Sequence, residues 1–154
     1  MANTEWNKLN RMQLGRYAEY YAKMEFASYG LDVYTSEVDD HGIDFIVKDK
    51  KGLFNEIQVK SLRIDKNNLV FMHKDKFDIE NKSLYLVILV FENNSVPTMY
   101  LVPANAWNSD SELFLTKDYD ENYKSKSEYR VNMSKKNMPL LEDYKFKNAV
   151  KDFM

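Results

Sequence analysis

The chain has 154 residues, the length of one ordinary domain, of which 44% are hydrophobic and 30% are charged. This composition is typical of a globular protein and excludes a collagen-like, linker-like or wholly disordered chain. The absence of cysteine excludes disulfides and thiolate metal sites, and a histidine count of 2 argues against a multi-histidine zinc site. The formal net charge of −2 at pH 7 argues against a nucleic-acid partner held by bulk basic charge.

No segment of the chain is predicted to enter a membrane. Residues 1–10 are polar and lack the apolar centre of a secretory signal. The longest apolar run, 84–91, is far shorter than the ~20 residues that a membrane-spanning helix needs. Together with the absence of cysteine, this predicts a cytoplasmic protein without a membrane partner. No internal repeat or low-complexity linker divides residues 1–154, so we expect a single domain.

The first predicted element is a helix over 6–29. Apolar and small side chains recur there at steps of three and four residues, at Leu9, Met12, Tyr17, Ala18, Tyr20, Ala22 and Met24. Asn3 or Thr4 is a suitable cap for its start, and Gly30 stands where a helix commonly ends. We expect the recurring side chains to form the face that packs on the rest of the domain.

A strand-rich segment follows the helix, with strands expected at 31–36, 43–48, 53–61, 69–72, 84–91 and 99–102. The sequence KDKKG, which ends at Gly52, predicts a hairpin turn between the second and third of these strands. The run 84–91 is apolar on both faces, which indicates a central strand.

Helices and a loop complete the predicted order. A short helix is expected near 74–80 and a closing helix near 144–153, while the charged, aperiodic stretch 116–130 predicts a loop. This order predicts an α/β fold with a mixed central sheet flanked by helices. Its core would span about 6–107, followed by a C-terminal extension over 108–154.

Polar side chains stand on one face of the predicted strand 53–61. Because side chains alternate along a strand, Ile57 and Val59 point to one face, and Glu56, Gln58 and Lys60 point to the other. This pattern alone is typical of a solvated strand face. If strands 43–48 and 53–61 pair as a hairpin, however, Asp44 lies near Gln58 and Lys60. A carboxylate that holds a divalent cation and a lysine that orients water are what metal-assisted phosphodiester hydrolysis needs.

Glu19 is a further candidate, on the border of the apolar stripe of the first helix. Taken alone, it is a surface glutamate paired with Lys23. It becomes informative in combination with the motifs that follow it in the chain.

Three motifs occur in order: L-G-R-Y-A-E at 14–19, G-I-D-F-I-V at 42–47 and E-I-Q-V-K-S at 56–61. In this order, on a helix and two strands, they resemble the PD-(D/E)xK nuclease superfamily. The similarity is greatest to the branch with junction resolvases, modification-dependent restriction endonucleases and uncharacterised bacterial families. The resemblance covers roughly residues 10–105 and implies a restriction-endonuclease-like αβββαβ core with a mixed sheet.

The resemblance also implies roles for individual residues. It assigns Asp44 as the metal-binding acid, Lys60 as the catalytic lysine and Glu19 as the helix acid of the metal site. Gln58 stands where the superfamily most often has Asp or Glu, and a backbone carbonyl near Val59 would complete the ligands. The implied cofactor is Mg²⁺ or Mn²⁺. A neutral amide at Gln58 should hold the cation less tightly than a carboxylate would.

Accessory residues are expected around this site. Glu56 lies two residues before Gln58 on the same face, and His41 and Asp40 flank Asp44, although DDHG at 39–42 is also a good polar turn. Lysine and arginine on or after the catalytic strand are candidates to contact nucleic-acid phosphates, or simply form a solvated face: Arg63, Lys66, Lys74 and Lys76.

These residues predict a Mg²⁺-dependent endonuclease that hydrolyses phosphodiester bonds in DNA, with a homodimer as a plausible assembly. The alternative is a catalytically inactive nuclease-fold module that binds nucleic acid or a protein partner, since a fold does not dictate a function. A third, weaker alternative is a metal-dependent hydrolase of another phosphoester. Acidic residues gathered around a metal site would account for the net charge, and binding to DNA should then depend on salt.

Overall fold

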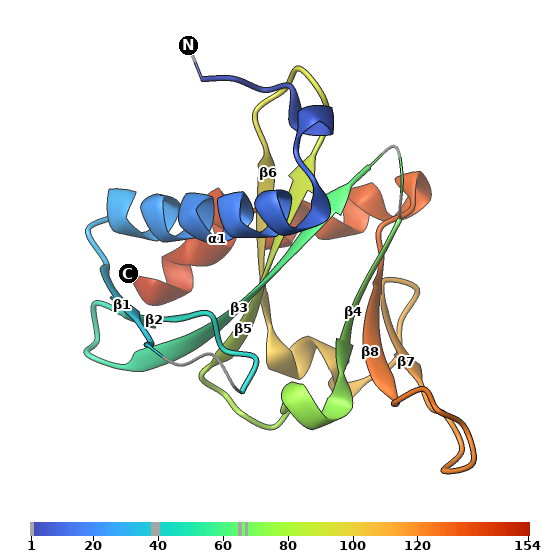
Figure 1. The fold of residues 1–154 in the computed structure, drawn as a ribbon. Helices are drawn as coiled ribbons and strands as arrows, with labels where there is room; N and C mark the ends of the chain where they lie inside the picture. The colour runs from blue at the N-terminus through green and yellow to red at the C-terminus, as the bar shows by residue number, and fades with distance from the viewer. Residues whose placement is uncertain (1, 38–40, 65, 67) are drawn as a thin grey trace.

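The computed structural model describes residues 2–37, 41–64, 66 and 68–154. One long helix lies across one face of a twisted sheet of five strands, and a smaller three-stranded sheet lies against the opposite face of the five-stranded sheet (Figure 1). The larger sheet and its helix consist of α1 Arg11–Ser28, β1 Asp32–Thr35, β2 Phe45–Lys48, β3 Phe54–Arg63, β5 Leu84–Phe91 and β6 Thr98–Pro103. The smaller sheet consists of β4 Leu69–His73, β7 Phe114–Lys117 and β8 Glu128–Asn132.

The larger sheet is mixed, as predicted. Its strand order is β1-β2-β3-β5-β6, and all neighbours are antiparallel except β3 and β5, which run parallel. β5 is buried on both faces, which confirms the prediction of a central strand. The smaller sheet has the order β4-β8-β7 and is antiparallel throughout. The chain therefore has the predicted α/β class, with a mixed central sheet flanked by helices.

Each face of the large sheet has its own apolar core. On the α1 face, Ala18, Ala22 and Phe26 pack against strand residues such as Phe45 and Ile57. This face also buries three aromatic side chains from distant parts of the chain: Trp6, Phe146 and Phe153. On the opposite face, β5 packs against the smaller sheet and the segments that follow it. The C-terminal residues thus belong to both cores.

The start of α1 corrects one sequence prediction. Residues Trp6–Lys8 form a separate 3-10 turn, η1, and the helix begins after Asn10. The side chain of Asn10 accepts a hydrogen bond from the N–H of Gln13 at 2.8 Å, and the Gln13 side chain accepts one from the N–H of Asn10 at 2.9 Å. This reciprocal capping box fixes the start of the helix at Asn10, so Asn3 and Thr4 are not its cap.

The buried stripe of α1 also differs from the prediction. Its fully buried side chains are Leu14, Ala18, Ala22 and Phe26. Met12, Tyr20 and Met24 were expected in the stripe, but they are 85%, 56% and 60% exposed. The small alanines lie at the centre of the contact, because they let the helix approach the sheet closely. Within the described residues, no helix has both the length and the apolar character to cross a membrane.

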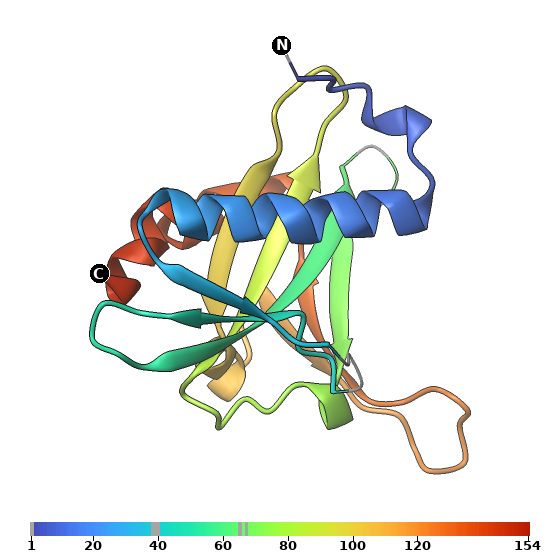
Figure 2. The same ribbon diagram turned by 60° about the vertical axis from the view of Figure 1, so that its left-hand side comes forward.

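One prediction between residues 74 and 130 was wrong, and another was correct only in part. The segment expected as a helix at 74–80 is a 3-10 turn, η2 Lys74–Lys76, and then a loop. In that loop, the Asp78 and Asn81 side chains accept backbone N–H hydrogen bonds that a helix would have used internally. The loop expected at 116–130 is confirmed over residues 118–127, whereas the two ends of this stretch belong to β7 and β8. Only the connection between these strands extends away from the body of the protein (Figure 2).

The C-terminal segment closes the fold as short helical turns. A separate turn, η3 Ala104–Asn108, follows β6, and the C-terminal turns are η4 Lys135–Tyr144, α2 Phe146–Ala149 and η5 Val150–Phe153. The last two confirm the expected closing helix, although it is divided. Because Phe146, Val150 and Phe153 are buried on the α1 face, this end of the chain holds α1 against the sheet.

Candidate active site

The site begins where β2 separates from β3. The last residue paired in this hairpin is Phe45, which lies opposite Ile57. Immediately before it, the N–H of Asp44 donates to the carbonyl of Ile57 at 2.9 Å. The Asp44 carboxylate then accepts a hydrogen bond from the N–H of Val59 at 2.6 Å. The Asp44 side chain thus accepts the β3 hydrogen bond that a backbone carbonyl of β2 would otherwise accept. Asp44 therefore lies beside Gln58 and Lys60, as predicted.

This arrangement leaves an open edge on β3. In a strand, the N–H and the C=O of one residue point to the same edge. Because the Val59 N–H meets Asp44 at the edge facing β2, the Val59 carbonyl points toward the same gap. The edge therefore presents a carboxylate and a carbonyl oxygen next to each other, and both are ligands that hard divalent cations prefer.

Gln58 adds a third oxygen on the face of the sheet opposite α1. Its side chain is only 6% exposed, and the oxygen Oε1 is buried without a hydrogen-bond partner among the residues that the structure describes. A buried amide oxygen without a partner is destabilising in a folded protein. Gly42 lies beside this amide: its φ of +79° favours glycine, and an added Cβ would be in ordinary van der Waals contact with Nε2 of Gln58 at 3.5 Å.

Lys60 lies further along the same face of β3 and is partly buried. Its ammonium group makes no hydrogen bond or ion pair with any residue in the described part of the chain. The next residue on this face, Leu62, is buried in the core between the two sheets. Lys60 is therefore the last polar side chain of the row formed with Glu56 and Gln58.

Glu19 lies on α1, the helix that packs on this sheet. It lies on the flank of the helix that carries Lys23 one turn later, and the Lys23 ammonium stands 5.7 Å from the centre of the Phe45 ring. This flank therefore faces β2 at Phe45. The Glu19 side chain is 16% exposed and accepts from Arg16 at 3.3 Å. One turn earlier, at Gly15, an added Cβ would meet no atom within 4 Å, so the flank is open there.

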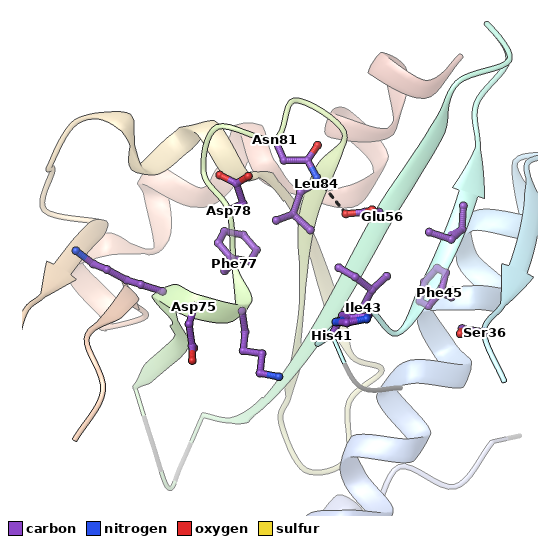
Figure 3. A pocket seen from close by; sticks show the side chains of 13 residues that line it. Ser36, His41, Ile43, Phe45, Glu56, Asp75, Phe77, Asp78, Asn81 and Leu84 are labelled. Atoms are coloured by element: carbon purple, nitrogen blue, oxygen red, sulfur yellow. Dashed lines mark hydrogen bonds between the residues drawn. The ribbon is translucent and has the colours of Figure 1, made fainter. Parts of the chain in front are cut away.

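A cleft of about 520 Å³ lies at the Glu56 end of the row of polar side chains on β3. Glu56 and Ile43 form one wall, and the segment that runs from η2 to Leu84 forms the other, with Phe77, Asp78 and Asn81 (Figure 3). The predicted residues His41, Lys74 and Lys76 also line this cleft. Asp40 was predicted as a further accessory residue and lies outside the described residues.

The predicted phosphate contacts do not share one surface. Lys74 and Lys76 lie at the cleft, although Lys74 is paired with Asp118 at 2.6 Å. Arg63 points to the α1 face, where its guanidinium donates to the carbonyl oxygens of Trp6 and Leu9. Lys66 is exposed in the turn before β4, so the length of that strand separates it from Lys74. Only the two lysines at the cleft can form a rim there.

The donor set suits a divalent cation bound by oxygen. No group of three His, Cys, Asp or Glu side chains that could hold a metal occurs among the residues the structure describes. The predicted set needs only the carboxylates of Asp44 and Glu19, because an amide oxygen and a carbonyl oxygen supply the rest. The unpartnered oxygen of Gln58 and the open edge at Val59 fit that requirement.

Sequence reasoning missed the second wall of the cleft. Asn81 donates to the Glu56 carboxylate at 3.0 Å, across 25 positions of the chain. The available signal was D-I-E-N-K-S at 78–83, whose Asp and Asn are typical of side chains that cap turns. That signal predicts a turn but does not predict which strand the turn meets.

The fold and the polar strand edge define the chain as a mixed α/β protein with a nuclease-like fold. One structurally similar protein is described as a bacterial homing endonuclease, I-Ssp6803I, with a TM-score of 0.54 and 17% sequence identity over 90% of each chain. At this identity, the similarity establishes a shared fold. No model of a known protein family matches the chain, and no curated protein sequence does.

Proposed function

We propose that the protein is a metal-dependent endonuclease that hydrolyses phosphodiester bonds in DNA. The main support is the open edge of β3. There the Asp44 carboxylate accepts a hydrogen bond from the N–H of Val59 at 2.6 Å, beside the unpartnered oxygen of Gln58. The fold shared with a bacterial homing endonuclease supports an activity on DNA. The order Asp44, Gln58, Lys60 also supports assignment to the PD-(D/E)xK superfamily.

Each residue of the site has a role in this proposal. Asp44, Glu19, Gln58 and the Val59 carbonyl would hold Mg²⁺ or Mn²⁺, which when bound supplies positive charge to the scissile phosphate. Lys60, on the same strand face as Gln58, positions the attacking water and helps to remove its proton. Lys60 lies opposite Ile88 of β5, which is buried in the core between the two sheets.

The direct test is cleavage of plasmid, branched and single-stranded DNA by the purified protein in Mg²⁺ or Mn²⁺. We expect cleavage by the wild type and a loss of about 10²–10⁴-fold in Lys60→Ala. Asp44→Ala should also be inactive. Lys51→Ala, an exposed lysine in the β2–β3 turn, is the matched control and should cleave normally. Full cleavage by Asp44→Ala or Lys60→Ala would contradict the assignment.

The neutral amide at Gln58 favours one alternative, a nuclease-fold module that binds nucleic acid without cutting it. The amide brings no charge to the cation, so it should bind metal less tightly than a carboxylate. Calorimetric titration with Mn²⁺ separates the two functions. Heat of binding that disappears in Asp44→Ala supports the enzyme, whereas no binding at millimolar Mn²⁺ supports the module.

A further inference from the structure

The cleft next to the candidate active site has the form of a binding pocket. Glu56 stands two residues before Gln58 on the same face of β3, which is about 7 Å along the strand. The cleft beside it is lined by the apolar side chains of Ile43, Ile46, Phe77 and Leu84. Its volume of about 520 Å³ lies in the range of pockets that bind small molecules.

Most carboxylates of the cleft already have partners. Asp75 is paired with Lys126 at 3.1 Å, and Asp78 accepts the N–H of Glu80 at 3.0 Å. Glu56 differs, because its only side-chain partner is the Asn81 amide, at 3.0 Å. No cation neutralises the Glu56 carboxylate among the residues that the structure describes. One of its oxygens is therefore available as an acceptor inside the cleft.

Asn81 holds this carboxylate in place and adds a donor. Its Oδ1 accepts the N–H of Ser83 at 2.9 Å, which fixes the orientation of the amide. Its Nδ2 donates one hydrogen to Glu56, and the amide group has a second hydrogen. The pair thus presents an acceptor next to a donor between apolar walls (Figure 3).

We propose that this cleft binds one unpaired nucleobase of the DNA strand that lies across the active site. The Watson–Crick edge of a base carries an N–H next to an acceptor, which complements the pair formed by Glu56 and Asn81. The apolar walls suit the faces of the base, and Lys74 and Lys76 on the lining suit the attached phosphate. This inference rests on the proposed nuclease function, because it assigns the cleft to the same substrate.

The proposal has a consequence for substrate choice. A base in a perfect duplex must be unpaired and unstacked before it can enter a pocket, and this step is unfavourable. Single-stranded, branched or mismatched DNA avoids much of that cost. The protein should therefore act on such DNA in preference to perfectly paired duplex.

The test uses single nucleotides, so that it does not depend on cleavage. The full-length protein without metal is titrated with dAMP, dCMP and deoxyribose 5-phosphate, and binding is followed by amide NMR shifts. We expect both nucleotides to bind about tenfold more tightly than the sugar phosphate, equivalent to about 1.4 kcal/mol. The side-chain amide of Asn81 and the backbone of Gly42 should show the shifts.

Variants of Glu56 provide the control. Glu56→Ala should abolish the preference for the nucleotides over the sugar phosphate, and Glu56→Gln, which keeps the shape, should weaken it. Glu112→Gln, at an exposed position, should retain it. Equal affinity of the wild type for dAMP, dCMP and deoxyribose 5-phosphate, or a preference that survives in both Glu56 variants, would overturn the proposal.

The same experiment separates this proposal from the nuclease function. Lys60→Ala should keep the nucleotide preference, because Lys60 does not line the cleft. DNA cleavage by a wild type that shows no nucleotide preference would overturn the base pocket and leave the nuclease intact. A nucleotide preference in a protein that cuts no DNA would support the pocket while contradicting the nuclease.

Discussion

The two faces of β3 belong to the same ten-residue strand, but their side chains differ in packing and in how many hydrogen bonds they make. On the α1 face, Ile57 is fully buried in the core, Asn55 donates to neighbouring oxygens and the Nη2 of Arg63 donates to two carbonyls, although its Nε is buried with no partner among the described residues. On the cleft face, Gln58 has a buried oxygen without a partner, and Lys60 makes no ion pair with the described residues.

This difference separates stability from chemistry within one strand. Side chains with complete hydrogen bonds and close packing stabilise the native state. Buried polar groups that lack partners lower stability, and they persist in proteins mostly where a ligand or a reaction requires them. Substitutions on the α1 face should therefore reduce stability, and substitutions on the cleft face should chiefly alter binding or catalysis.

The largest expected effect on stability is that of Ile57→Ala. Ile57 is 0% exposed, so its truncation leaves a cavity under α1 and should lower the free energy of unfolding by about 2–5 kcal/mol. Lys60→Ala, on the cleft face, should change it by less than about 0.5 kcal/mol. Urea denaturation measures both. Similar losses in the two variants would show that the faces do not differ in this way.

A smaller loss is expected for Arg63→Met. The substitution keeps a long apolar stem but leaves the carbonyls of Trp6 and Leu9 without their donor, at a cost of about 1–3 kcal/mol. Lys66→Met, in the exposed turn, is the matched control and should be nearly neutral. If Arg63→Met retained full stability but lost DNA binding, Arg63 would act as the phosphate contact that the sequence suggested.

Two buried amides on β3 allow a finer comparison. Asn55 is 5% exposed and its amide donates to the carboxylate of Asp49 at 3.2 Å, whereas Gln58 is 6% exposed with an unpartnered oxygen. Asn55→Leu should lower the free energy of unfolding by about 1–2 kcal/mol, because it leaves acceptors without a donor. Gln58→Leu should leave it unchanged or raise it by up to about 1 kcal/mol.

The same pair of variants reports on the proposed metal. Calorimetry should show that Gln58→Leu binds Mn²⁺ more weakly than the wild type, and that Asn55→Leu binds it normally. A strongly destabilised Gln58→Leu would mean that the amide supports the fold and is not kept for a ligand.

Local patterns were sufficient to predict the central part of the fold. The alternation of Ile57 and Val59 with polar residues gave the faces of β3, and Gly52, at φ +88°, ends the predicted turn. Because a hairpin pairs residues close in sequence, the proximity of Asp44 to Gln58 could be predicted without the structure. The helix start at Asn10 was also encoded locally, in the N-x-x-Q of its capping box, but apolar spacing alone did not reveal it.

Distant pairings account for most of what the sequence did not predict. β8 pairs with β4 through Leu69 and Asn132, so its strand character depends on a partner far along the chain. The contact between Glu56 and Asn81 is of the same kind. Arg63 illustrates a further limit. The sequence pattern of a basic residue at the end of a strand is the same whether its side chain faces solvent or donates hydrogen bonds to backbone carbonyls.

The smallest effect concerns pH and the turn that joins β2 to β3. Burial of the Asp49 carboxyl favours its neutral form, but hydrogen bonds from the N–H of Leu53, the Asn55 amide and the N–H of Lys51 outweigh it, so the pKa of Asp49 is lowered. A lowered pKa in the folded state stabilises the protein above the unfolded value of about 3.9. That contribution is lost as the pH falls through the folded pKa.

Asp49→Asn should therefore be less stable than the wild type at pH 7, and the difference should shrink as the pH falls below about 4. Urea midpoints measured from pH 7 down to the lowest pH of cooperative unfolding provide the test. Leu53→Ala, an exposed neutral change in the same turn, should give a curve parallel to the wild type. If the difference in unfolding free energy between wild type and Asp49→Asn stayed constant with pH, the ionised carboxylate would not be what organises the turn. The order on the α1 face of β3 would then depend on the Asn55 amide alone.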